Sequence, residues 1–363
     1  MTFRIFRPSF KKNSLFCCRI LGVPNIRLTI YIQISMKTIL TFRFSAMGDV
    51  AIAASVMKEI AAQHPEIRFV FATRTFFAPF FDNIPNLEVF PIDFNGKYKG
   101  LKGLFRLYKD LSKSYKIDAI ADLHDVLRSK LLALCFRLSF KKIKIATIDK
   151  GRKEKKRLCN TNNTDKKPLV TTWQRYTEVF QQLKIKTIIK PANIPYLPET
   201  VKKIGISPFA QHKGKMYPPE LMEKVLELLN DNYEVYLFGG GKKEQELCEK
   251  WQKKYENVHS VVGKYSLKKE LEFISTLDVM LSMDSSGMHL ASLCNVPCVS
   301  VWGATHPFAG FVGFGQENNP QIQLELPCRP CSVYGNKACK YGDYRCLWGV
   351  APEGVVQGLR FKV

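Results

Sequence analysis

The feature that most constrains the fold is an alternation of short β-rich runs with longer amphipathic stretches, which starts at Thr38. In the first half the β-rich runs are TILTFRF, IRFVFA, LEVFPI, DAIADL and IKIATID. The stretches between and after them predict helices over 49–63, 101–115, 126–138 and 173–183, with an aromatic helical segment after IRFVFA. Residues 151–167 are basic and polar and lack periodicity, so we predict an exposed loop there. Such alternation is typical of βαβ units, in which helices cover both faces of a mostly parallel sheet.

The alternation restarts after a proline-rich segment. KPANIPYLP, at 190–198, holds three prolines and cannot be helical, so it is the best candidate for an interdomain linker. The second half contains KKIGISPFA, YEVYLFGGG, VHSVVG, DVMLSMD and CVSVWG, and it predicts helices over 218–230, 242–255, 266–276, 287–294 and 351–359. We therefore predict an α/β protein with two Rossmann-like domains and mostly parallel sheets, with the first domain at 36–190, the linker at 191–200 and the second domain at 201–363.

The formal net charge of +23 predicts contact with polyanions or anionic surfaces. The sequence lacks a recognition helix, zinc-finger spacing and an RNP-type aromatic sheet, and its lysines are spread along the chain, which argues against nucleic acid. An acidic membrane surface, a phosphorylated glycolipid and a merely solvated basic surface remain as explanations. Most of the 11 cysteines stand singly in apolar patterns, which favours reduced cysteines and a cytoplasmic protein.

Residues 1–35 are basic, contain no acidic residue and are interrupted by Pro8 and Pro24. We interpret this N-terminal extension as a misassigned upstream start or a weak membrane-surface tail, and not as a signal peptide. No run of the sequence reaches the ~18–20 apolar residues of a membrane span.

Ser45-Ala-Met-Gly-Asp49 connects the first predicted strand to its helix, at the sheet edge where open α/β folds bind ligands. Gly48 permits a tight turn there. Asp49 can cap the helix or direct its carboxylate into the crevice as a general base, and from this motif alone the cap is favoured. Asp122, His124 and Asp125 follow a neighbouring strand and are alternative bases.

Two loops of the second half have the composition of phosphate and ribose sites. ISPFAQHKGKMYPP, at 206–219, places Ser207, Lys213 and Lys215 between a strand and a helix, where they can surround a diphosphate or lie in an ordinary solvated loop. GGGKKEQ, at 239–245, brings Glu244 to a helix start, where it can bond ribose hydroxyls, although a glycine run is weak by itself.

SMDSSGMH, at 282–289, is the strongest local motif because it gathers an acid, two hydroxyls, a glycine and a histidine at one strand-to-helix junction. A hydroxyl and N–H nest at a helix start accepts phosphate oxygens, and His289 can help to neutralise them. The candidate residues are Asp284, Ser285, Ser286, Gly287 and His289.

Together these motifs resemble glycosyltransferase family 9, the heptosyltransferases of lipopolysaccharide core synthesis. The resemblance extends from Met36 to the C-terminus and includes FRFSAMGDVAIAASV, DLHDVLRSKLLA, GISPFAQHKGKMYPPE, LFGGGKKEQE and VVGKYSLKKELEFISTLDVMLSMDSSGMHLASLCNVPCVSVWGATHP. The chain departs from the family where Ser286-Gly287 replaces a common Gly-Pro and Met216 replaces a frequent arginine.

The resemblance implies a GT-B fold and an inverting, metal-independent transfer, with heptose passing from ADP-heptose to a lipopolysaccharide core or lipid A-type acceptor. No cofactor beyond the nucleotide-sugar substrate is implied, and the partners would be that donor, the glycolipid and the cytoplasmic face of an anionic inner membrane. By position, Asp49 matches the catalytic base. Lys215, Glu244, Asp284, Ser285 and His289 match donor-binding positions, and the acceptor is expected near Arg43, Ser45, Arg128 and Ser129.

Cys328, Cys331, Cys339 and Cys346 are clustered in the sequence, and they could form a structural zinc knuckle. We favour reduced structural cysteines, because the second pair lacks the tight spacing of a typical zinc site. Two other functions remain open, a nucleotide-sugar epimerase of the same architecture and a catalytically silent nucleotide-sugar-binding protein.

Overall fold

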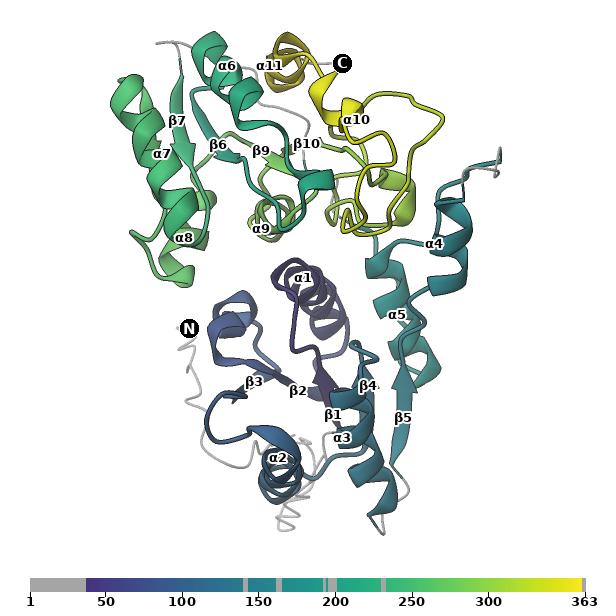
Figure 1. Ribbon diagram of the computed structural model, residues 1–363. Coiled ribbons are helices and arrows are strands. Elements are labelled where there is room, and N and C mark those ends of the chain that lie inside the picture. The colour runs from purple at the N-terminus through teal and green to yellow at the C-terminus, as the bar shows by residue number, and fades with distance from the viewer. Residues whose placement is uncertain are drawn as a thin grey trace, which may run out of the picture.

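The computed structural model describes residues 37–139, 143–160, 165–191, 194, 201–229 and 233–360. The predicted N-terminal extension, and all of the predicted linker except Pro191 and Ile194, lie outside these residues. Two parallel sheets organise the chain, with helices between them and on their outer faces (Figure 1).

The first sheet has the strand order β3-β2-β1-β4-β5, and every neighbouring pair is parallel. Its strands are β1 (Lys37–Phe42), β2 (Ile67–Arg74), β3 (Leu87–Ile92), β4 (Ala119–Asp122) and β5 (Lys144–Thr147). The helices connected to them are α1 (Met47–Gln63), the 3-10 helix η1 (Thr75–Phe81), α2 (Gly100–Ser114), α3 (Leu127–Leu138), α4 (Arg152–Leu158) and α5 (Thr172–Gln182).

The second sheet has the order β11-β10-β9-β6-β7-β8 and is also parallel throughout. Its strands are β6 (Lys203–Ser207), β7 (Glu234–Leu237), β8 (Val258–Ser260), β9 (Val279–Met283), β10 (Cys298–Val301) and β11 (Gln321–Ile322). The helices are η2 (Lys213–Lys215), α6 (Pro219–Leu229), α7 (Lys242–Lys254), α8 (Leu267–Ile274), α9 (Ser286–Leu293), η4 (Pro307–Ala309), α10 (Arg345–Trp348) and α11 (Pro352–Arg360).

Three apolar clusters hold these layers together. One packs α2 and α3 against the outer face of the first sheet, and another packs α6 and α11 against the second sheet. The third is continuous between the sheets, because α1 and η1 of the first half pack against α8 and α9 of the second half. The two halves therefore share part of their buried apolar surface and face each other through α1 and α9 (Figure 1).

Two local predictions are wrong. Residues 151–167 are not simply an exposed loop, because α4 forms at Arg152–Leu158 after Gly151, whose φ of 59° is a left-handed conformation. Only Lys155 and Leu158 of this helix are buried, and one such pair is too short a pattern to reveal a helix in the sequence. The first helix begins at Met47 with Ala46 as its N-cap residue, so Asp49 is at the third helical position; from there its carboxylate accepts a hydrogen bond from the Ala46 N–H and still contributes to capping, but not as the N-cap residue.

Among the helices that the structure describes, none combines the length and the apolar composition needed to cross a bilayer.

Candidate active site

A cleft of about 700 Å³ opens between the two halves of the molecule. Its first-domain wall is the turn into α1, from Ala46 to Asp49, together with Phe76 of η1. Its second-domain wall is formed by the loops that follow β6, β7 and β9. These loops leave the carboxyl ends of parallel strands, which is the edge where open α/β sheets bind ligands.

Asp49 forms the polar centre of the first-domain wall. One carboxylate oxygen makes an ion pair with the guanidinium of Arg43 and accepts a hydrogen bond from the backbone N–H of Ala46 at 3.4 Å. The side chain is 29% exposed, so it can still be reached from the cleft. Burial by itself would raise the pKa of Asp49, but Arg43, His289 and the Ala46 N–H outweigh burial and lower it. Asp49 is therefore held as a carboxylate, the form that a general base requires.

Arg43 lies behind Asp49 and is almost completely buried. Besides the ion pair, its guanidinium donates a hydrogen bond to the carbonyl of Leu123 at 2.8 Å, and it lies 6.0 Å from the ring centroid of Tyr176. It does not line the cleft. Its contacts suit an orienting group for Asp49 better than the acceptor contact that the sequence predicts.

The other predicted acceptor residues also lie away from the cleft lining. The Ser129 hydroxyl is fully buried. It donates a hydrogen bond to Asp122 at 2.8 Å and accepts one from the N–H of Val126, and these bonds close the turn into α3. Arg128 is exposed and stacks 4.1 Å from the ring centroid of Phe94, while Ser45 is half-buried. Of the alternative bases, Asp122 is buried and accepts hydrogen bonds from the backbone N–H groups of His124 and Asp125.

His289 crosses from the second-domain wall to the first. It projects from the first turns of α9, and its imidazole packs so closely on Gly48 that a Cβ atom at that position would overlap the ring. Burial lowers the pKa of His289 to about 4, so the imidazole is neutral at pH 7. Without a bound anion it therefore carries no positive charge, and its contact with Gly48 fixes how α1 and α9 meet.

The second-domain wall holds the predicted lysine and acidic side chains. Lys215 Nζ lies 3.1 Å from an oxygen of Asp284, whose side chain is buried at the end of β9. Ser285 is the N-cap residue of α9 and lines the cleft together with Ser207 and Ser286. A helix start beside a lysine attracts anionic groups such as phosphate.

Gly287 explains one departure from the family pattern. A Cβ atom at Gly287 would lie 2.5 Å from the hydroxyl of Ser207 and 2.8 Å from that of Ser282. The absent side chain lets the first turn of α9 approach β6 and β9, so the serine hydroxyls and the helix start lie close together.

Two further predicted donor residues differ in their surroundings. Glu244, at the start of α7, lines the cleft and accepts a hydrogen bond from the N–H of Gly240 at 2.7 Å, which closes the glycine loop. Lys213 is exposed and does not line the cleft, although it is two residues from Lys215.

The sequence did not predict several residues that complete the cleft. Phe311, just after η4, and Val333 and Tyr334, in the C-terminal segment with the clustered cysteines, all line it. On the first-domain side, Lys150 is close enough to lower the pKa of Asp49, and Arg152 makes a 2.7 Å ion pair with Asp125. These cations precede or belong to α4, the helix that the sequence did not reveal.

Burial raises the pKa of Cys346 to about 11; Arg329 opposes this effect, and the thiols of Cys331, Cys328 and Cys339 add to it. Cys328, Cys331, Cys339 and Cys346 are all unpaired thiols. Within the described part of the chain, no group of three or more histidine, cysteine or acidic residues is arranged to hold a metal ion.

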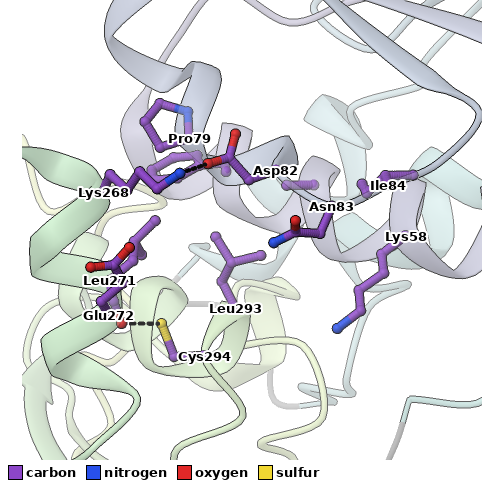
Figure 2. A pocket seen from close by; sticks show the side chains of 12 residues that line it. Lys58, Pro79, Asp82, Asn83, Ile84, Lys268, Leu271, Glu272, Leu293 and Cys294 are labelled. Atoms are coloured by element: carbon purple, nitrogen blue, oxygen red, sulfur yellow. Dashed lines mark hydrogen bonds and ion pairs between the residues drawn. The ribbon is translucent and has the colours of Figure 1, made fainter. Parts of the chain in front are cut away.

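A second pocket of about 310 Å³ lies where η1 and α1 meet α8 and α9 (Figure 2). The Lys268 ammonium lies 2.9 Å from the carboxylate of Asp82 at its rim, so this exposed ion pair connects the two halves.

Curated relatives of this chain are heptosyltransferases. A Campylobacter jejuni protein named lipooligosaccharide heptosyltransferase 2 is 27% identical over 186 residues, which are 50% of this chain and 58% of that protein. The chain thus matches less than two thirds of that relative's length. The lipopolysaccharide core heptosyltransferase OpsX of Haemophilus influenzae is 24% identical over 289 residues, covering 75% of this chain and 80% of the relative.

Solved structures share the fold. A family 9 glycosyltransferase from Veillonella parvula superposes with a TM-score of 0.67 at 17% identity, covering 89% of this chain and 96% of that one. The E. coli heptosyltransferase WaaC with ADP gives a TM-score of 0.63 at 18% identity, covering 88% and 98%. The two facing parallel sheets are therefore a GT-B fold, as predicted.

The family model described as glycosyltransferase family 9 (heptosyltransferase) matches residues 104–342, which is more than half of the sequence. This chain belongs to glycosyltransferase family 9.

Proposed function

We propose that this chain transfers heptose from ADP-heptose to a lipopolysaccharide core or lipid A-type acceptor, with inversion at the anomeric carbon and without a metal ion. The donor would bind to the second-domain wall and the acceptor to the first, at the cytoplasmic face of the inner membrane. The names of the curated relatives and the ADP bound by the E. coli protein support these substrates.

One observation carries the proposal: an ionised carboxylate and an anion-attracting helix start face the same cleft from opposite domains. Asp49 is on one side, and Lys215 with the start of α9 is on the other. An inverting transfer needs a base for the acceptor hydroxyl and a separate site for the leaving diphosphate.

The reaction that fits this arrangement is a single displacement. The acceptor oxygen attacks the anomeric carbon from the face opposite the diphosphate, and its proton passes to Asp49 as the new C–O bond forms. The bond between the anomeric carbon and the phosphate oxygen breaks, and the electron pair leaves with ADP. Lys215 and the N–H groups of α9 would stabilise the charge on that leaving group.

The first-domain wall also suits an acceptor that carries negative charge. Lys150 and Arg152 lie on the same side of the cleft as Asp49, and burial followed by Arg43 lowers the pKa of Lys150. An anionic group that binds between neighbouring cations stabilises their charged forms.

The test is to incubate the purified chain with ADP-heptose and a heptose-free lipopolysaccharide core, and to measure product mass and released ADP. Transfer only when both substrates are present supports the proposal, and the anomeric configuration of the product tests inversion. Chemical change of the donor without acceptor would favour an epimerase instead, and binding without turnover would favour a silent binding protein.

A further inference from the structure

Large apolar side chains that are exposed to solvent are concentrated on α2 and α3. Five of the thirteen large apolar side chains that are exposed in the described residues belong to these two helices. Leu127 and Leu138 of α3 are each 75% exposed and Leu134 is 45% exposed, while Leu101 and Phe105 of α2 are 75% and 51% exposed. Transferring such a set from water to an apolar phase is favourable.

These side chains form one surface because α2 and α3 lie together on the outer face of the first sheet, on the side away from the second domain (Figure 1). Leu127, Leu134 and Leu138 recur at helical spacing along α3. The ring of Phe105 stacks on Tyr108 at 5.9 Å, and Tyr108 meets Phe136 of α3 edge-on at 4.9 Å. These ring contacts join the two helices, so their exposed apolar side chains belong to one packed unit.

Basic residues surround this apolar surface, and acidic ones are nearly absent. The sequence of α3 contains no acid, and the single acid of α2, Asp110, is already bound by Lys97 and by the hydroxyl of Tyr98. The exposed cations of the two helices are Lys102, Arg106, Lys109, Lys113, Arg128, Lys130 and Arg137. Leucine and phenylalanine flanked by lysine and arginine are the pattern of a helix that lies in the interface of an anionic membrane.

One end of this surface, at the start of α3, lies at the sheet edge that carries Asp49. α3 begins five residues after the end of β4, and Asp122 at the end of β4 is opposite Phe42 at the end of β1 in the sheet. The chain runs from β1 directly to Asp49, so the start of α3 and the proposed base lie at the same sheet edge. A lipid-linked sugar could reach Asp49 while its acyl chains stay in the membrane.

We propose that the outer faces of α2 and α3 dock on an anionic lipid bilayer and orient the cleft toward its glycolipid acceptor. This rests on the proposed function for the acceptor, but vesicle binding can be measured without donor, acceptor or turnover.

The experiment is co-sedimentation of the full chain with vesicles of phosphatidylethanolamine and phosphatidylglycerol, compared with vesicles of phosphatidylcholine alone. We expect binding to the anionic vesicles that weakens as salt is raised. Each cation at an anionic surface contributes about fivefold in affinity, so Lys102→Gln/Lys109→Gln/Arg137→Gln should weaken binding by about a hundredfold. Leu127→Ser/Leu134→Ser/Leu138→Ser should weaken it by about tenfold or more, because the inserting side chains are lost.

The matched control is Ile188→Ser/Lys250→Gln/Lys253→Gln, which removes an exposed apolar side chain and two exposed lysines elsewhere on the surface and should leave binding unchanged. Wild-type vesicle binding in both test variants would overturn the proposal. So would binding to RNA but not to vesicles, or a fall in molecular mass by light scattering in the leucine variant, which would show that this face joins two copies of the chain.

Transfer to a deacylated, water-soluble acceptor separates this proposal from the proposed function. If the chain binds vesicles but uses neither soluble nor membrane acceptor, the proposed function fails and the docking surface stands. If it uses the soluble acceptor but does not bind vesicles, the docking surface fails alone.

Discussion

The two walls of the cleft are built in different ways. The second-domain wall comes largely from three loops, each of which follows a strand of one sheet and leads into a helix, and most of its polar residues stand in those loops or at the helix starts. On the first-domain side, a single turn presents Asp49, and the groups that set its charge lie far apart in the sequence, at Arg43, Lys150 and His289. One wall is therefore a set of local motifs, whereas the other depends on tertiary contacts. Four substitutions test that difference.

The largest effect is expected for Asp49→Asn. The amide can still accept a hydrogen bond from the Ala46 N–H but cannot take a proton, so turnover should fall by about 10²–10⁴. The rate is measured at saturating donor and acceptor, and donor affinity by calorimetry. Asp82→Asn is the control, since it also removes a carboxylate from an ion pair, outside the cleft.

Because Asp49→Asn also breaks the ion pair with Arg43, its melting temperature must be compared with that of the wild type. Near wild-type turnover in a folded Asp49→Asn protein would contradict the assignment and direct the search for a base to Asp122, His124 or Asp125.

Lys215→Ala tests the second-domain wall. Loss of a charge-assisted contact to phosphate costs about 1.5–3 kcal/mol, so donor affinity should fall about tenfold to a hundredfold. Lys213→Ala is a close control because it removes the same charge from the same loop but outside the cleft, and it should bind donor normally. Equal effects of the two substitutions would mean that general positive charge matters and the Lys215 position does not.

Gly48→Ala tests the contact between the walls. The added methyl group would overlap the imidazole of His289 and force α1 and α9 apart, so transfer should slow by about tenfold while donor binding changes little. The double variant Gly48→Ala/His289→Ala removes the overlap and should recover part of the rate. If Gly48→Ala slows transfer as much in the His289→Ala protein as in the wild type, Gly48 acts through the turn itself and not through His289.

The smallest effect concerns stability in acid. The pKa of His289 is lowered from 6.5 to about 4, chiefly by burial, so between these pH values the unfolded chain takes up a proton that the folded chain refuses. The free energy of unfolding therefore decreases as the pH falls from about 6.5 to 4, and His289 accounts for about 3 kcal/mol of that decrease at most. His289→Asn should lose less stability than the wild type between pH 7 and pH 5 in thermal melts. His259→Asn is the control, and the same acid sensitivity in both variants would contradict the assignment to His289.

The sequence by itself was sufficient for the architecture of both halves. The alternation of apolar runs with helical patterns predicted most strands and helices, since parallel strands buried on both faces need nearly continuous apolar sequence. It also placed Lys215, Asp284 and Ser285 in the cleft, because a loop after a parallel strand always leads to the same edge of the sheet.

Only the tertiary structure decided the surroundings of Asp49. A six-residue separation does not reveal that Arg43 turns inward to pair with it, and the basic stretch that follows gives no sign that Lys150, just before a short helix, will lower the pKa of Asp49. Nor could local pattern predict that Ser129 closes a buried turn or that Tyr334 reaches the cleft from the C-terminal segment. Periodicity records which face of an element is buried, whereas the charge state of one carboxylate depends on groups that folding brings to it from distant parts of the chain.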